Sequence, residues 1–201
     1  MMPTLAFLLG VLIGSLPTAG WLARLRGIDL RQAGTANPGT NNALQLGGPV
    51  LAASVLAVEI AKGAAAVWLG QRLGADSGAA LAGVGATVGN VYNPWYGFRG
   101  GKGLAITGGT ILAAWPLLVP VLALVIGVSV AVMRRSGPAA LITLFAYLGA
   151  ALVGLEVTLP GRGVIDDAVW AVVLAAGQSA VMAPKHLTDT LRRFDRRTSP
   201  G

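Results

Sequence analysis

The chain has 201 residues, of which 54% are hydrophobic and 11% are charged, whereas roughly 25% of the residues of a soluble domain are charged. This composition excludes an ordinary soluble domain and indicates an integral membrane protein. The formal net charge is +7, but the aromatic residues interleaved with a basic face that mark a nucleic-acid-binding domain are missing. We therefore expect no nucleic-acid partner, and positive charge sorted to one side of a bilayer.

Cysteine is absent and histidine occurs once, which limits the chemistry of the chain. Disulfides and thiolate catalysis are excluded, and so is a metal site built from several histidines. We expect no metal and no cofactor.

The first apolar run covers residues 3–21 and is long enough to span a bilayer. It lacks the basic start of a cleavable signal peptide, and Gly14-Ser15-Leu16-Pro17 interrupts it. Such an interruption is tolerated where neighbouring helices or a cavity satisfy the freed backbone groups. We expect one membrane domain over residues 1–201, with a short basic cytoplasmic tail over about 184–201.

Residues 24–48 are polar and contain GTANPGTNN at 34–42, so we expect a loop or a re-entrant segment there. Apolar runs follow at about residues 49–69 and 79–91. The first carries Glu59 and Lys62, which lie three residues apart on one helical face and can neutralise each other. They either face a functional cavity or form an ion pair that only orients the helix.

Residues 104–133 are apolar throughout, and one straight helix of that length would measure about 45 Å, too long for a hydrocarbon core of about 30 Å. We predict a short helix, a turn at Trp115-Pro116 and a second helix that ends at Met133. Two further apolar runs, at about residues 138–155 and 168–183, complete the set.

The distribution of the 15 Lys and Arg residues tests this division of the chain. With seven membrane-embedded helices, only Arg72 and Arg162 fall on one side and Lys62 falls inside a span. The other side receives Arg24, Arg26, Arg31, Arg99, Lys102, Arg134, Arg135, Lys185, Arg192, Arg193, Arg196 and Arg197. We therefore predict an all-α polytopic membrane protein of about seven helices, with its N-terminus outside and its C-terminus in the cytoplasm.

The segment with the clearest chemistry is GFRGGKG at residues 97–103. Glycines let a backbone approach a ligand closely, and Arg99 and Lys102 supply positive charge, so the loop suits a phosphate group. The loop is not a P-loop, because Gly103 stands where that motif needs the hydroxyl of a serine or threonine. The alternative interpretation is a flexible loop at the membrane surface with two cations that set topology.

The predicted topology places three polar elements on the cytoplasmic face: GTANPGTNN, GFRGGKG and the helix end around His186. Asp189 and Arg192 follow His186 at spacings of three, so the three side chains share one helical face. Together these elements predict a basic pocket at the membrane surface, suited to a phosphate ester that meets a lipid-soluble partner.

These segments resemble the bacterial acyl-phosphate:glycerol-3-phosphate acyltransferases. The resemblance rests on GSLP at 14–17, DLR with GTANPGTNN at 29–42, EIAKG at 59–63 and above all GFRGGKGLAIT at 97–107. It implies a multi-pass protein of the bacterial inner membrane that transfers a fatty acyl group from acyl phosphate to glycerol 3-phosphate, giving lysophosphatidic acid for phospholipid synthesis. It also implies acyl phosphate, glycerol 3-phosphate and the lipid bilayer as partners, with no cofactor.

The chain departs from the family pattern at several positions. Thr35 replaces a serine, Gln45 an arginine, Asn90 a histidine and Asp189 an asparagine. An anionic Asp189 weakens phosphate binding unless it pairs with a cation, for which we expect Arg192 or Arg193.

The resemblance and the polar motifs together give a set of candidate site residues. We expect Lys102, His186 and Thr35 to act in catalysis, with His186 as the general base. The expected substrate- and phosphate-binding residues are Ser15, Gly34, Asn37, Gly39, Asn42, Arg99, Gly100, Gly101, Gly103, Asp189 and Arg192. The glycines are expected to contribute backbone N–H groups. We expect the mechanism to depend on positioning the substrates and on neutralising the charge of the leaving phosphate.

Two other functions stay open on the sequence alone. The chain could be a related enzyme with a different acceptor, because Gln45 lacks the guanidinium of the family. It could also be a lipid or anion transporter or a membrane scaffold, for which interrupted helices and the Glu59/Lys62 pair would suit transport. Against transport, the chain has no internal repeat and its polar motifs gather at one face.

Overall fold

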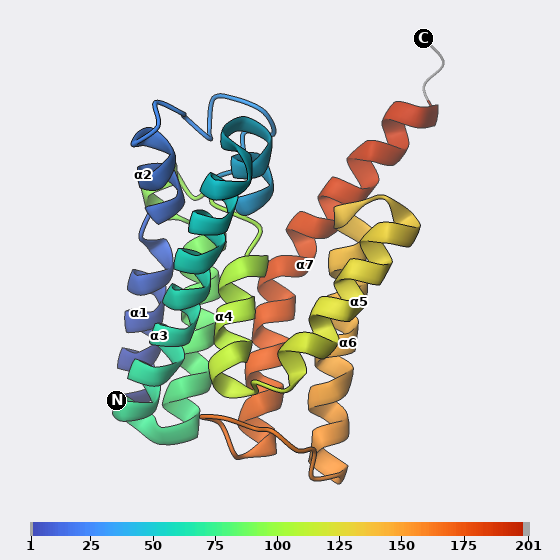
Figure 1. Ribbon diagram of the computed structural model, residues 1–201. Coiled ribbons are helices and arrows are strands. Elements are labelled where there is room, and N and C mark those ends of the chain that lie inside the picture. The colour runs from blue at the N-terminus through green and yellow to red at the C-terminus, as the bar shows by residue number, and fades with distance from the viewer. Residues whose placement is uncertain (1, 199–201) are drawn as a thin grey trace.

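A computed structural model describes the backbone of residues 2–198 and the side chains of residues 2–191. Throughout this part of the chain the secondary structure is helical, without a strand (Figure 1). In chain order the elements are α1 (Met2–Ser15), α2 (Thr18–Arg24), α3 (Thr40–Val91), the 3₁₀ helix η1 (Pro94–Tyr96), α4 (Leu104–Ala114), α5 (Leu118–Met133), α6 (Ser136–Glu156) and α7 (Ala168–Thr198).

Helix α3 is not one straight rod, because its backbone leaves helical geometry at Gly48 and again at Gly74 and Ala75. At the second break the chain reverses direction, so two antiparallel segments correspond to the two predicted apolar runs (Figure 1). The expected loop or re-entrant segment, which ran to residue 48, is shorter in the structure. Residues 40–47 already form a short helix, which Gly48 ends with a φ of 75°.

The predicted break in the long apolar run is confirmed. Helix α4 ends at Ala114 and α5 begins at Leu118. The indole Nε1 of Trp115 donates a hydrogen bond of 2.9 Å to the carbonyl of Pro160, so the turn is fixed to the loop between α6 and α7.

Within the described residues, four helical stretches are long and apolar enough to cross a membrane: Met2–Arg24, Thr40–Tyr96, Ser136–Glu156 and Ala168–Leu191. Helices α4 and α5 are apolar but shorter. In Figure 1, α1 starts at the lower end of the bundle and α7 rises to the upper end. Helix α7 continues through residue 184 to Thr198, so the described part of the predicted basic tail is helical.

Glycines bring α1 and α3 into direct backbone contact. A Cβ atom on Gly10 or Gly14 would collide with the carbonyls of Ala82 or Ala86. Helices in lipid gain little from apolar association, so close packing through small residues is a main source of their stability. These contacts fix α1 against the part of α3 that leads into the glycine-rich loop.

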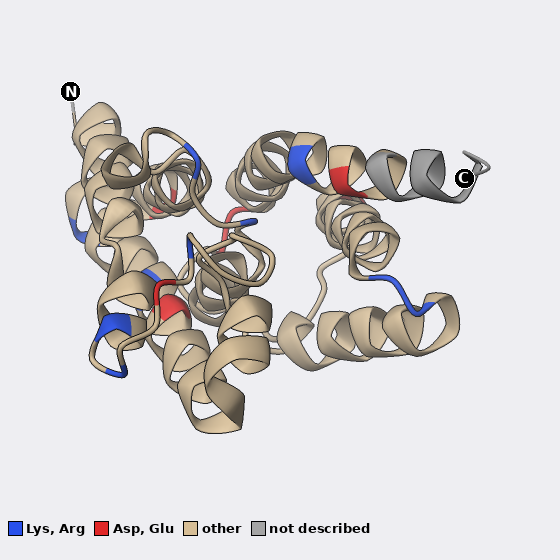
Figure 2. Cartoon of the chain, turned by 90° about the horizontal axis from the view of Figure 1, so that it is seen from above, with Lys and Arg blue, Asp and Glu red and all other residues tan. Residues whose placement is uncertain are grey.

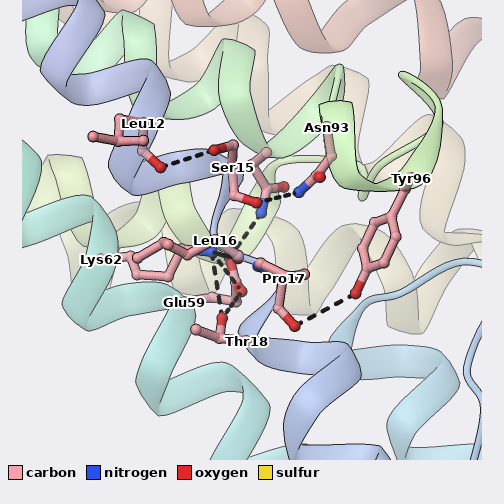
Figure 3. A network of polar contacts seen from close by, with 10 residues as sticks. Leu12, Ser15, Leu16, Pro17, Thr18, Glu59, Lys62, Asn93 and Tyr96 are labelled. Carbon is pink, nitrogen blue, oxygen red and sulfur yellow. Dashed lines mark hydrogen bonds and ion pairs between the residues drawn. The ribbon is translucent and has the colours of Figure 1, made fainter.

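The interruption between α1 and α2 is stabilised by three side chains from elsewhere in the chain (Figure 3). The carbonyls of residues 15, 16 and 17 accept hydrogen bonds from Asn93 Nδ2 at 2.8 Å, Lys62 Nζ at 2.8 Å and Tyr96 OH at 3.4 Å, respectively. Backbone groups freed at membrane depth need such partners. The break therefore depends on residues of α3 and of the segment that follows it.

A polar seam centred on Gln178 joins α3, α4, α6 and α7 inside the bundle. The Gln178 amide donates to the hydroxyls of Thr87 at 2.9 Å and Thr110 at 2.7 Å, and its oxygen accepts from Tyr147 OH at 3.3 Å. Buried polar groups that satisfy one another in this way define a unique packing of the helices around them.

Most cationic segments lie at the upper end of the bundle. The segments that carry residues 24–31, 99–102 and 134–135 all lie there, while the turn at Gly74 and the loop of residues 157–167 lie at the lower end (Figure 1). Seen from above, Lys and Arg are distributed over the loops of this end (Figure 2). The side chains of Arg192, Arg193, Arg196 and Arg197 lie outside the described residues.

Candidate functional site

The glycine-rich loop of residues 97–103 connects η1 to α4 at the upper end of the bundle. Gly97 and Gly103 have φ values of 58° and 86°, which residues other than glycine rarely adopt. The N–H groups of Gly100 and Gly101 donate to the carbonyls of Val91 at 3.1 Å and Asn90 at 3.0 Å. In this structure these two groups therefore shape the loop, which differs from their expected role as phosphate donors.

Gly100 and Gly101 are needed because the loop packs directly on the end of α3. A Cβ atom on Gly100 would overlap the carbonyl of Asn90, and one on Gly101 would lie 2.9 Å from Asn90 Oδ1. The loop is thus pressed against Asn90, which stands at the position of the family's histidine.

The N-terminus of α4 offers the anion-binding groups that the loop glycines do not. Gly103 is the N-cap residue and provides no side-chain cap. The first N–H groups of a helix have no intrahelical partner and carry the positive end of the helix dipole. Lys102, Gly103 and the first helical residues, Leu104 to Ile106, line a cavity of about 530 Å³, which we call the inner cavity.

The segment rich in Asn and Thr forms the facing wall of the inner cavity. Thr35, Asn37 and Gly39 line this cavity, as the sequence motif predicted. The structure thus brings together two motifs that lie about sixty residues apart in the sequence.

Asn42 lies behind this wall and is fully buried. Its Nδ2 donates to the carbonyls of Leu30 at 2.8 Å and Ala33 at 3.1 Å, and its Oδ1 accepts from the N–H of Thr35 at 2.9 Å. Neither Asn42 nor Gly34 lines the cavity. Asn42 therefore shapes the segment, which is a different role from the donor to substrate that we expected.

Ser15 is also placed away from the cavity. It is buried at the end of α1, where its hydroxyl donates to the carbonyl of Leu12 at 2.8 Å (Figure 3). Its carbonyl accepts from Asn93, so Ser15 belongs to the interruption between α1 and α2.

Lys102 and Asp189 form an ion pair of 2.7 Å across 87 residues of sequence. Their side chains are 31% and 29% exposed, so solvent and ligands can reach both. We expected Arg192 or Arg193 as the partner of Asp189, and the side chains of both arginines lie outside the described residues. The observed pairing places the cation of the loop against the carboxylate of Asp189 on α7.

His186 is 1% exposed and lines the inner cavity. Its Nε2 lies 3.3 Å from the carbonyl oxygen of Lys102. Among the described residues its Nδ1 has no hydrogen-bond partner although it is buried. An imidazole that donates from Nε2 keeps Nδ1 as a proton acceptor, so this nitrogen is available for chemistry.

A second cavity of about 410 Å³, the outer cavity, lies on the other side of the Lys102–Asp189 pair. Arg99, Gly100 and Lys185 line it together with both members of the pair. Asn37 borders both cavities. The two cavities therefore meet at the Lys102–Asp189 pair.

A third, apolar cavity of about 360 Å³ continues the inner cavity into the bundle. Leu56, Leu104 and Ala105 line both, so the polar and apolar spaces share a boundary. Farther from this boundary the walls come from α5 and α6, including Leu122, Ile126, Leu144 and Tyr147. The arrangement suits a ligand with a charged head and an aliphatic chain.

Glu59, Asn90 and Ser136 also line the inner cavity, although none of them was among the candidate site residues. Glu59 Oε1 lies 3.0 Å from Lys62 Nζ and accepts from Thr18 at 2.8 Å, and Glu59 Oε2 accepts from Asn90 at 2.7 Å. The predicted pairing of Glu59 with Lys62 is confirmed. The cost of a carboxylate inside a span indicated that Glu59 either faces a cavity or only pairs with Lys62, and in the structure it lines a cavity and makes the pair. Ser136 gives no such signal.

The sequence of this chain is similar to those of known proteins. A family model described as glycerol-3-phosphate acyltransferase matches residues 4–195. A glycerol-3-phosphate acyltransferase of Synechococcus sp. is 48% identical over 115 residues, which cover 56% of this chain and 57% of that protein. The enzyme of the same description from Paramagnetospirillum magneticum is 42% identical over 145 residues, covering 71% of this chain and 72% of that protein.

Two solved structures share the fold. They are crystal structures of PlsY (YgiH), an integral membrane glycerol 3-phosphate acyltransferase, in a glycerol 3-phosphate form and a lysophosphatidic acid form. Their TM-scores are 0.76 and 0.79 at 24% and 23% identity, and the matches cover 94% of each of those chains and 100% and 98% of this one. From the family match over residues 4–195, this chain belongs to the glycerol-3-phosphate acyltransferase family.

Proposed function

We propose that this protein transfers a fatty acyl group from acyl phosphate to the hydroxyl of glycerol 3-phosphate, forming lysophosphatidic acid. The observation that carries the proposal is the junction of the inner cavity with the apolar cavity. Lys102 and the α4 N-terminus stand at the polar end, and aliphatic side chains of α3 to α6 line the other. An acyl phosphate has the same division into an anionic head and an aliphatic chain.

The phosphate groups of both substrates require cations and N–H donors. Lys102 supplies a compact positive charge that both cavities share, and the first turn of α4 supplies N–H groups and the positive end of a dipole. Thr35 and Asn37 add neutral donors on the facing wall, and Arg99 adds charge in the outer cavity. These groups suit the phosphate groups of two substrates, a mixed anhydride and a phosphate ester, that meet at Lys102.

In the reaction, the acceptor hydroxyl oxygen bonds to the acyl carbonyl carbon, and the bond between that carbon and the phosphate oxygen breaks. Phosphate leaves with the electron pair of the broken bond. Negative charge therefore moves onto the leaving phosphate, where Lys102 and the helix N-terminus stabilise it. Holding both substrates side by side at Lys102 also lowers the entropy cost of bringing them together.

The hydroxyl must lose its proton as it attacks. His186 is the expected proton acceptor, because Nδ1 is buried, lacks a partner among the described residues and belongs to a side chain in the cavity wall. Its Nε2 contact with the Lys102 carbonyl fixes the ring relative to the loop.

We also propose that the seven apolar segments predicted from the sequence cross or enter the bacterial inner membrane. In this orientation the N-terminus lies outside and the site lies on the cytoplasmic side. The cationic loops at the upper end support this orientation, since loops rich in Lys and Arg stay in the cytoplasm. A soluble phosphate ester would then reach the site from the cytoplasm, and the acyl chain from the bilayer.

The direct test incubates purified protein in detergent with palmitoyl phosphate and glycerol 3-phosphate. We expect lysophosphatidic acid and inorganic phosphate to appear in equal amounts. Phosphate release without lysophosphatidic acid would indicate hydrolysis or another acceptor. No consumption of palmitoyl phosphate would contradict the proposal.

A further inference from the structure

Lys185 holds the glycine-rich loop from the neighbouring helix α7. Its ammonium group donates to three carbonyl oxygens, those of Val91 at 2.7 Å, Gly100 at 2.9 Å and Gly101 at 3.0 Å. An ammonium group has three N–H donors, so all of them are used by the protein. The same group lies 5.9 Å from the centre of the Tyr92 ring, within range of a cation–π contact.

The position of these carbonyls decides where the loop points. A peptide unit is planar and trans, so holding the Gly101 carbonyl toward Lys185 turns the N–H of Lys102 away from it. The next residue of α7, His186, contacts the next carbonyl, that of Lys102. Adjacent side chains of α7 therefore fix three consecutive carbonyls, at residues 100 to 102.

We propose that Lys185 is a positioning residue that fixes the backbone of the glycine-rich loop and so aims Lys102 and the start of α4 into the inner cavity. Lys185 differs in this from Lys102 and Arg99, because its hydrogens are taken by neutral backbone oxygens. The kinetic part of the inference rests on the proposed function, whereas the structural part does not.

The test compares Lys185→Met with wild type by hydrogen–deuterium exchange in detergent. Methionine keeps the length of the side chain and removes every donor. We expect the amides of Gly100 and Gly101 to exchange roughly tenfold faster, because their bonds to Val91 and Asn90 open when the loop is released. Exchange in α6 should be unchanged.

The matched control is Arg134→Gln, which removes a cation at the same end of the bundle from an exposed residue that lines none of the three cavities. It should leave exchange in the loop and turnover as in wild type. If Lys185→Met does not fold, Lys185→Gln retains an N–H donor without the charge, and its loop should still exchange faster than that of wild type.

Kinetics supply the second readout. We expect Lys185→Met to lower kcat on the order of 100-fold, as a displaced catalytic group does, and to raise KM for glycerol 3-phosphate, because Lys102 also binds the phosphate of that substrate. Loop exchange equal to wild type in a folded Lys185 variant would overturn the proposal, even if turnover fell. If wild type itself were inactive, the proposed acyl transfer would fail while the exchange experiment would still decide the role of Lys185.

Discussion

At the scale of single residues, the contact between Lys102 and Asp189 joins the cation of the glycine-rich loop to a position where this chain departs from the family pattern. The family places an asparagine where this chain has Asp189, and the carboxylate lies 2.7 Å from the ammonium of the glycine-rich loop. A phosphate that binds Lys102 must compete with this internal anion. The pairing therefore predicts weaker substrate binding than a neutral residue would allow.

Asp189→Asn should accordingly bind glycerol 3-phosphate more tightly, by about threefold, because the competing ion pair is partly exposed and so of modest strength. Isothermal titration calorimetry in detergent measures this affinity. Asp29→Asn is the matched control, since it removes a half-buried carboxylate at the same end that lines neither polar cavity. Unchanged or weaker binding by Asp189→Asn would contradict the competition.

Glu59 and Lys62 form the buried ion pair, and each also bonds a neighbour of the interruption after α1 (Figure 3). Removing one partner of a buried pair costs about 3–5 kcal/mol because the other charge is stranded. Glu59→Gln and Lys62→Met should each destabilise the fold by that order, and the double variant by clearly less than the sum. Thermal unfolding of all four proteins in one detergent gives the cycle, and additive losses would rule out the coupling.

Residue patterns predicted part of the site. Spacing along one helix placed Glu59 beside Lys62 and His186 beside Asp189, because i and i+3 residues share a face. It could not predict that Asp189 reaches Lys102, since that contact depends on how α7 packs against a loop 87 residues away. Nor could it separate Asn37, which lines the cavity, from Asn42, whose amide is used inside the segment.

At the scale of elements, the site is held by close contacts between helices. A Cβ atom on Gly63 of α3 would collide with the carbonyl of Ile106 in the first turn of α4. This contact sets the distance between α3 and the helix whose N-terminus lines the inner cavity. The packing of α4 therefore depends on a residue without a side chain.

Gly63→Ala should destabilise the protein by about 1–3 kcal/mol, since the added methyl group overpacks the contact. Gly149→Ala in α6 is the matched control, because nothing lies within 4 Å of its Cβ position and alanine favours a helix by up to about 1 kcal/mol. Thermal unfolding in detergent should rank Gly149→Ala at or above wild type and Gly63→Ala below both. Equal stability of the two variants would contradict this account of α3 and α4.

The sequence predicts where a helix ends if the apolar run is too long for one span or contains a proline. The break at Trp115-Pro116 was predicted because 30 apolar residues exceed the hydrocarbon core. The helix over residues 40–47 was not, because glycine, asparagine and threonine favour loops, and here the tertiary packing of Leu51, Ala43 and Leu30 overrides that preference.

At the scale of the whole molecule, the two ends of the bundle differ in charge. The upper end carries most of the cationic loops and both polar cavities, while the lower end carries the loop between α6 and α7. The sequence predicted this asymmetry because successive membrane segments run in opposite directions, which places most of the Lys and Arg residues at one end.

Single introduced cysteines test the proposed orientation, and no other residue of the chain reacts as a thiol because the chain has no native cysteine. Arg134→Cys lies in the turn between α5 and α6, and Thr158→Cys lies at the opposite end after α6. A membrane-impermeant maleimide applied to intact cells should label Thr158→Cys and spare Arg134→Cys until the membrane is opened. The reverse pattern would invert the topology.

The central claim, that Lys102 stabilises the phosphate leaving in acyl transfer, is tested most directly by the turnover of Lys102→Ala against wild type with palmitoyl phosphate and glycerol 3-phosphate. We expect wild type to form lysophosphatidic acid and Lys102→Ala to form it on the order of 100- to 1,000-fold more slowly, with unchanged thermal unfolding. Equal turnover by the two proteins would contradict the account.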